Sequence, residues 1–126
     1  MLLGIGVDIV EIARIESALE RFGERFAQRI LTDSEIETFA ARERKASFLA
    51  SRFAAKEAVS KALGTGVAQG IGFRDIEIVN DALGKPGVLF HGAANRLAQR
   101  HGVCNALVSL SDERHYCVAM VTLESG

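Results

Sequence analysis

Asp8 is a carboxylate inside an otherwise apolar segment, Gly-Ile-Gly-Val-Asp-Ile-Val at positions 4–10. A carboxylate buried there without a partner is costly, so a cation, a metal ion or backbone N–H groups must compensate its charge. Because Asp also favours the caps of helices, the alternative is that Asp8 ends a strand and caps the helix that follows. Asp8 is therefore a candidate ligand, with a capping role as the competing interpretation.

A second polar pattern lies in the segment Arg-Phe-Ala-Ala-Lys-Glu-Ala-Val-Ser-Lys at positions 52–61. On a helix, residues four apart share a face. Arg52, Lys56 and Ser60 form one row, and Glu57 and Lys61 form the neighbouring row. The alternative is a solvated face with an ordinary Glu57–Lys61 pair, which contributes a few tenths of a kcal/mol.

The segment Gly64-Thr65-Gly66 follows this polar helix directly and opens a glycine-rich loop that extends to position 72. Glycine lets the backbone approach a phosphate closely, and cations beside such a loop suit phosphate binding. The spacing matches neither the Walker A motif nor GxGxxG. The loop alone is therefore a weak indication of a phosphate site.

The first predicted helix has arginines at spacings of seven and four, Arg14, Arg21 and Arg25. These spacings place them along one helical side, away from the apolar residues. The row suits docking of an acidic partner. The alternative is surface pairing with the glutamates of the same helix, which contributes little to stability. Those glutamates are Glu11, Glu16, Glu20 and Glu24.

The elements that must position these residues follow from hydrophobic periodicity and turn signals. Residues 2–10 are predicted to form a buried strand, and Thr32 and Glu35 form a capping box before a short helix. Helices are predicted over 11–28, 45–63 and 92–100, and strands over 73–80, 88–90, 103–110 and 115–123. This order predicts an α+β fold, a single domain over 1–126 with a mostly antiparallel sheet and helices packed on one side.

Composition excludes several classes of protein. The chain has 126 residues, 25% of them charged, and a net charge of −1, which gives no reason to expect a nucleic-acid partner. Its apolar stretches fall short of the ~20 residues of a membrane span, and its start lacks a basic region, so we expect neither a membrane protein nor a signal peptide. Cys104 and Cys117 lie in apolar runs, which favours core positions and a reducing cytoplasm.

Four segments resemble the holo-acyl-carrier-protein synthases, which are 4′-phosphopantetheinyl transferases. They are the opening Gly-Ile-Gly-Val-Asp-Ile-Val-Glu-Ile-Ala-Arg-Ile, the central Arg-Phe-Ala-Ala-Lys-Glu-Ala-Val-Ser-Lys-Ala-Leu-Gly-Thr-Gly, Leu-Gly-Lys-Pro at 83–86 and the closing hairpin Asp-Glu-Arg-His-Tyr at 112–116. The resemblance covers essentially the whole chain. Many members of the family have His at the place of Asp112, so a role assigned to that histidine does not carry over.

The resemblance implies transfer of the 4′-phosphopantetheine group from coenzyme A to a serine of apo-acyl carrier protein, a step in fatty acid biosynthesis, with Mg²⁺ required and adenosine 3′,5′-bisphosphate released. It implies a homotrimer with active sites between subunits, and the 4′-phosphopantetheinyl transferase fold. Asp8 and Glu57 match the family's metal ligands, and Glu57 and Lys61 are the catalytic candidates. The candidates for contacts to the nucleotide are Arg52, Lys56, Lys61, Gly64, Thr65 and Gly66, and Arg14, Arg21 and Arg25 are the candidates for carrier binding.

Two other functions remain as alternatives at this point. One is a different Mg²⁺-dependent enzyme that cleaves a pyrophosphate or transfers a phosphoryl group without a carrier protein. The other is a non-enzymatic oligomeric binding module. Within the transferase hypothesis, the base that accepts the serine proton is Glu57 or a metal-bound water.

Overall fold

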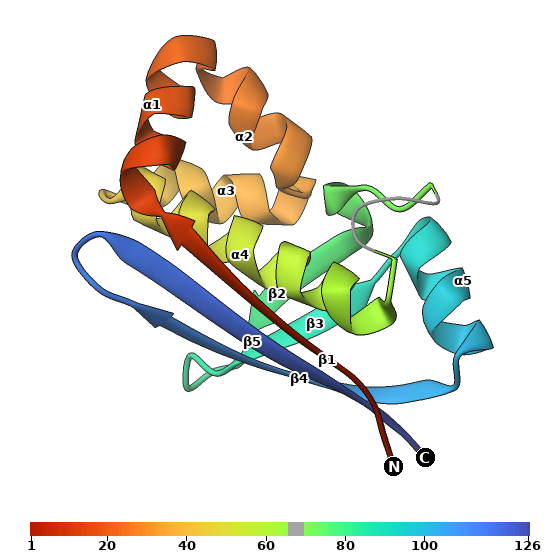
Figure 1. Ribbon diagram of the computed structural model, residues 1–126. Coiled ribbons are helices and arrows are strands. Elements are labelled where there is room, and N and C mark those ends of the chain that lie inside the picture. Colours follow the sequence, from red (N-terminus) through yellow and green to blue (C-terminus); the bar gives the residue numbers. More distant parts are fainter. Residues whose placement is uncertain (66–69) are drawn as a thin grey trace.

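The structure is a computed structural model that describes residues 1–65 and 70–126 (Figure 1). Its elements in chain order are β1 (Leu2–Glu11), α1 (Ile12–Phe22), α2 (Glu24–Ile30), α3 (Asp33–Ala41), α4 (Lys45–Leu63), the 3₁₀ turn η1 (Phe73–Asp75), β2 (Ile76–Asn80), β3 (Pro86–Phe90), α5 (Gly92–Arg100), β4 (Val103–Asp112) and β5 (Tyr116–Ser125).

A three-stranded antiparallel sheet in the order β1-β5-β4 forms one layer, and β2 and β3 form a separate antiparallel pair. The long helix α4 lies along one face of the larger sheet, with the other helices on the same side (Figure 1). This arrangement confirms the predicted α+β class with antiparallel strands. The register places Asp8 of the edge strand β1 opposite Ala119 of the central strand β5.

Strand β1 is in close contact with α4 through two glycines. A Cβ atom added to Gly4 would lie 2.1 Å from the carbonyl oxygen of Ala62, and one added to Gly6 would lie 1.9 Å from that of Ala58. Only glycine allows the strand backbone to approach the helix backbone this closely. The glycines therefore set the depth at which β1 rests on α4.

The prediction that residues 2–10 form a buried strand is wrong for one of the strand's two faces. Gly6 and Val10 are buried, whereas Ile5, Val7 and Ile9 are exposed. Alternate side chains of a strand point to opposite faces, and α4 covers only one of them. The apolar residues on the other face have no cover within the described chain.

The single helix predicted over 11–28 is also corrected, because the structure breaks it into α1 and α2 at Gly23. Gly23 adopts φ 66° and ψ −151°, a conformation that only glycine tolerates readily, and the chain changes direction there. Phe22, predicted to belong to the apolar side, is 57% exposed as a result.

The other predicted elements are confirmed with small changes at their ends. Thr32 and Glu35 form the reciprocal capping box, and α4 has the predicted bounds, with Gly64 in the left-handed conformation at its end. The strand predicted from residue 73 begins at Ile76, because residues 73–75 form a 3₁₀ turn. The closing hairpin pairs β4 with β5 as predicted.

No helix in the described ranges is both long enough and apolar enough to cross a membrane.

Candidate active site

Asp8, Glu57 and Lys61 come together where β1 crosses α4. The Nζ atom of Lys61 donates hydrogen bonds to the carbonyl oxygen of Val7, at 2.9 Å, and to Oδ1 of Asp8, at 3.1 Å. Glu57 lies one helical turn before Lys61, on the same side of α4. Two carboxylates and an ammonium group from two sequence motifs therefore share one location.

The placement of Asp8 excludes the capping interpretation. Asp8 lies within β1, and the residue at the cap position of α1 is Glu11, which makes no side-chain capping bond. Asp8 and the two glycines share one parity along β1, so its side chain is on the α4 side of the sheet. The ion pair at this site is Lys61 with Asp8, whereas the sequence suggested Glu57 with Lys61 as the ordinary surface pair.

Negative charge is concentrated at this site. Burial raises the pKa of Glu57, the Asp8 carboxylate raises it further, and the Lys61 ammonium acts in the opposite direction. Two nearby carboxylates on a half-buried surface are the hard oxygen donors that suit Mg²⁺, which keeps waters and binds substrate phosphates in its remaining positions. No group of three or more His, Cys, Asp or Glu residues in the described ranges is placed to hold a metal.

The row of Arg52, Lys56 and Ser60 is buried, so the alternative interpretation of this row as a solvated face is wrong. These three residues are 7%, 0% and 0% exposed. The ammonium of Lys56 contacts the carbonyl oxygen of Ile30 and Oε1 of Glu35, each at 2.6 Å. Lys56 is therefore unavailable to a nucleotide phosphate, and we withdraw it from the candidate phosphate ligands.

Breaking this pair by removing one partner would leave an uncompensated buried charge, at a cost of about 3–5 kcal/mol. Burial lowers the pKa of Lys56, and the neighbouring Glu35 carboxylate counteracts this effect through both charge and hydrogen bonding.

Arg52 differs from Lys56 because its guanidinium reaches a cavity. That cavity, of about 530 Å³, is also lined by Arg42, Arg44 and Asp112. The guanidinium stacks on the Phe48 ring at 4.4 Å and donates to Ser51, and its Nε has no hydrogen-bond partner among the described residues. Neither Asp8 nor Glu57 lines this cavity, so the arginine cluster and the carboxylate pair occupy separate locations on one chain.

The remaining candidates lie at other positions. Gly64 and Thr65 follow Lys61 at the end of α4, and Gly66 lies outside the described residues. Arg14 and Arg21 are exposed on α1, but Arg25 belongs to α2 beyond the break at Gly23. The predicted continuous row of three arginines is therefore not a feature of one helix.

Sequence reasoning missed two groups of residues at or near these sites. Glu35 was interpreted only as part of a capping box, although its carboxylate also pairs with Lys56. Arg42 and Arg44 were not considered, and the signal that could have found them is their position directly before the long helix that contains Arg52.

The chain is similar to proteins of one family over nearly its whole length. The model of the 4′-phosphopantetheinyl transferase superfamily matches residues 4–121. A holo-[acyl-carrier-protein] synthase of Vibrio cholerae is 57% identical over 124 residues, which is 98% of each chain. The protein of that name from Halorhodospira halophila is 56% identical over 126 residues, which is 100% of each chain.

Solved structures of the same kind of protein are similar in fold. The crystal structure of holo-[acyl-carrier-protein] synthase from Neisseria meningitidis superposes with a TM-score of 0.94 at 42% identity, covering 99% of this chain and 100% of the other. The enzyme from Bacillus anthracis, solved in complex with CoA (3′,5′-ADP), gives a TM-score of 0.85 at 39% identity, covering 100% of this chain and 99% of the other.

Proposed function

Because the chain belongs to the 4′-phosphopantetheinyl transferase superfamily, we propose that it transfers 4′-phosphopantetheine from coenzyme A to a serine of apo-acyl carrier protein. The by-product is adenosine 3′,5′-bisphosphate. The observation that supports this function is the meeting of Asp8 from the opening motif with Glu57 and Lys61 from the central motif. Residues 1–126 act as one catalytic domain in this proposal, in the cytoplasm and in fatty acid biosynthesis.

In the reaction, the serine oxygen of the carrier forms a bond to the phosphorus of the phosphopantetheine arm. The bridging P–O bond of the pyrophosphate breaks, the adenosine bisphosphate leaves with the bridging oxygen, and the serine proton passes to a base. Asp8 and Glu57 are the residues that would hold Mg²⁺, which supplies stabilisation of the charge that develops on the phosphate oxygens. Lys61 contributes a third charge on the same side of α4 and binds a phosphate oxygen.

The base that accepts the serine proton in this proposal is Glu57 or a water molecule at this site.

The nucleotide end of coenzyme A is assigned to Arg52 and to the start of the glycine loop, Gly64 and Thr65. Arg52 supports this assignment because its guanidinium, together with two further arginines, lines a cavity that suits a phosphate. Arg52 and Glu57 are five residues apart on α4 and point roughly 140° away from each other. One coenzyme A molecule that engages both therefore requires the two locations to come from adjacent copies of the chain.

A homotrimer meets this requirement, and the exposed apolar face of the larger sheet supports it. Val7 of β1 pairs with Met120 of β5, and Ile9 pairs with Val118. Together with Ile5, these paired side chains are exposed apolar residues of the two neighbouring strands, on the face opposite α4. Contiguous apolar patches of this kind mark protein interfaces.

The acidic carrier protein is assigned to α1, where Arg14 and Arg21 are exposed, with Arg25 on the adjoining α2. The exposed Phe22 ring lies under Arg21, whose guanidinium is 5.3 Å from the ring centroid. Because the net charge of the chain is only −1, attraction to an acidic partner must come from such a local patch.

The decisive experiment mixes the protein with coenzyme A, Mg²⁺ and apo-carrier protein and then measures the mass of the carrier. We expect the carrier to gain one phosphopantetheine arm, and we expect no gain without Mg²⁺. Loss of coenzyme A without carrier modification would indicate a hydrolase, and no change in either would indicate a binding module. Both of those outcomes contradict the proposal.

A further inference from the structure

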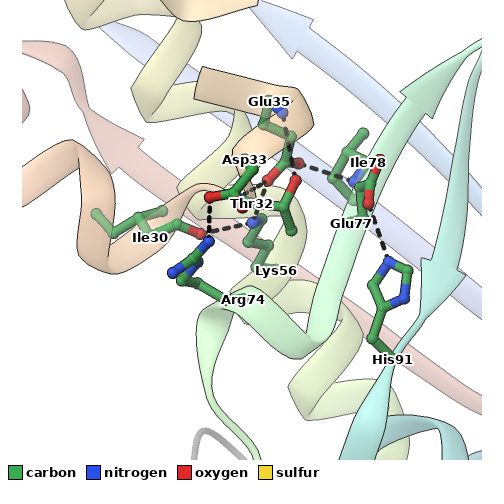
Figure 2. Close-up of polar contacts among 9 residues, drawn as sticks. All are labelled: Ile30, Thr32, Asp33, Glu35, Lys56, Arg74, Glu77, Ile78 and His91. Atoms are coloured by element: carbon green, nitrogen blue, oxygen red, sulfur yellow. Dashed lines mark hydrogen bonds and ion pairs between the residues drawn. The ribbon is translucent and has the colours of Figure 1, made fainter. Parts of the chain in front are cut away.

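The buried ion pair of Glu35 and Lys56 lies where α2, α3, α4 and β2 meet (Figure 2). The two side chains are 3% and 0% exposed. A buried charge is retained only where its partners satisfy it, and here the partners come from α2, α4, β2 and the N-cap of α3 itself.

The hydrogen bonds of the pair reach all four elements. Lys56 of α4 donates to the carbonyl oxygen of Ile30, the last residue of α2. Oε1 of Glu35 accepts from Lys56 and from the Thr32 backbone N–H at 2.9 Å, and Oε2 accepts from the Ile78 backbone N–H of β2, also at 2.9 Å. Figure 2 shows the bonds from Lys56, Thr32 and Ile78 converging on the Glu35 carboxylate.

The contact of α4 with β1 has a different character. There the backbones of Ala58 and Ala62 face Gly4 and Gly6, and the side-chain hydrogen bonds across the contact come from the half-exposed Lys61, whose flexible stem can follow a small movement of the helix. Contacts between small groups are non-directional and do not resist a small rotation of a helix about its axis. Buried hydrogen bonds to backbone groups do resist it, because they depend on both distance and angle.

Rotation of α4 matters because the residue after Lys56 is Glu57. Adjacent helical residues are related by about 100° and 1.5 Å, so a turn of the helix that moves the Lys56 ammonium also moves the Glu57 carboxylate relative to Asp8. Arg52 lies one turn before Lys56, and the Glu35 carboxylate is near enough to act on its charge as well.

We propose that Glu35 and Lys56 are positioning residues that fix the rotation of α4 and thereby place Glu57 beside Asp8 and Arg52 at the arginine-lined cavity. This inference rests on the proposed function, because it assigns the pair a part in transfer. Neither residue touches the substrate. Their effect passes through the backbone of one helix.

The test compares Lys56→Met, Glu35→Gln and the double variant with a control of similar stability. The single variant Lys56→Met leaves a buried carboxylate without its partner and is the least stable of the three. The double variant is neutral at both positions and recovers much of that stability, which a double-mutant cycle of thermal unfolding measures. The control is Leu49→Ala, which removes buried apolar volume from α4 without touching the pair.

At a temperature where every variant is folded, we expect the double variant to lose about 10- to 100-fold in kcat, since a misplacement of about 1 Å costs on the order of 100-fold. We also expect its half-saturating Mg²⁺ concentration to rise, with the KM for the carrier unchanged. Leu49→Ala is expected to keep the wild-type kcat, half-saturating Mg²⁺ concentration and KM for the carrier.

If activity and Mg²⁺ response recover together with stability in the double variant, the pair is only structural and the inference is overturned. Glu35→Gln keeps the side-chain shape and decides the question if the Lys56 variants do not fold: wild-type kcat and Mg²⁺ response overturn the inference, and a fall in kcat with a weaker Mg²⁺ response supports it. A wild-type protein that transfers no phosphopantetheine would instead refute the proposed function, which the carrier-mass assay reveals independently.

Discussion

At the scale of single residues, the unusual feature is that Asp8 and Glu57 accumulate negative charge where burial already disfavours it. The raised pKa of Glu57 reflects that cost. Packing alone does not require two carboxylates at this contact, whereas binding a divalent cation does. The Lys61 ammonium compensates part of the charge through an ion pair that is half exposed, so it contributes little to stability itself.

We predict that Asp8→Ala and Glu57→Ala each lower kcat by at least about 100-fold, because the charge stabilisation that is lost is worth several kcal/mol. Thermal unfolding should remain near that of the wild type, since burial disfavours the Glu57 carboxylate and the ion pair of Asp8 with the half-exposed Lys61 contributes little to stability. Carrier modification followed by mass spectrometry measures the rate. Glu37→Ala, at an exposed carboxylate of α3, is the matched control. A near-normal kcat in either site variant would refute the two-carboxylate site.

The sequence predicted the residues of this site that stand out as local patterns, and it did not predict those whose environment depends on tertiary contacts. The sequence singled out Asp8 as a carboxylate in an apolar strand and Glu57 and Lys61 as a polar row on a helix, and the family resemblance supplied their predicted roles. The environment of Lys56 was not visible. Helical periodicity shows which residues share a face, but only the tertiary structure shows that α2, α3 and β2 cover this one.

At the scale of elements, the β1–α4 contact positions both carboxylates, and it depends on the absence of side chains at Gly4 and Gly6. The apolar pattern of β1 was interpreted as burial on both faces. A run of apolar residues does not distinguish a strand that is covered on both faces within its own chain from a strand with one face exposed on that chain. The break between α1 and α2 was missed for a related reason. The helical spacing of apolar residues continues across Gly23, although the backbone of Gly23 is not helical.

Gly6→Ala should destabilise the protein by about 1–3 kcal/mol and reduce transfer, because the new methyl group would lie 1.9 Å from a carbonyl oxygen and must push β1 away from α4. Differential scanning calorimetry and the carrier-mass assay measure the two effects. Gly87→Ala is the control, as the nearest atom to its added Cβ is 3.8 Å away. Equal melting temperatures for the two variants would contradict this account of the contact.

The docking role proposed for α1 makes a kinetic prediction. Arg14→Glu and Arg21→Glu should raise the KM for the carrier steeply and leave the KM for coenzyme A almost unchanged, because in this proposal only the carrier contacts this surface. Added salt should have the same effect on the wild type by screening the charges. Arg96→Glu, at an exposed arginine of α5, serves as the control. An unchanged KM for the carrier at low salt would contradict the docking role and would mean that the arginines of α1 form an ordinary solvated surface.

At the scale of the whole molecule, the carboxylate pair and the arginine-lined cavity are separate on one chain, and one face of the larger sheet is apolar and exposed. A trimer would explain both observations, since it covers the sheet and brings the two locations together from neighbouring subunits. We therefore expect light scattering to give the mass of three chains.

Mixing two inactive variants tests whether the site is shared between subunits. Asp8→Ala retains the arginine cavity and Arg52→Ala retains the carboxylate pair, so mixed trimers contain some complete sites. After refolding an equal mixture, we expect about a quarter of the wild-type rate, since each half-site is intact in half of the subunits. The separately refolded variants are the controls, and a mixture no more active than their average would mean that each chain holds a complete site.

The pairing of β1 with β5 also has a consequence for biosynthesis. Strand β1 is synthesised well before its partner strand β5, since Leu2 pairs with Glu124. At about 5–20 residues per second, the nascent chain waits roughly 6–25 s before this partner exists. During that interval the apolar side chains of β1 have neither a strand beside them nor a second copy to cover them. The newly made chain is therefore a natural client for chaperones, and its yield on overexpression should depend on their supply.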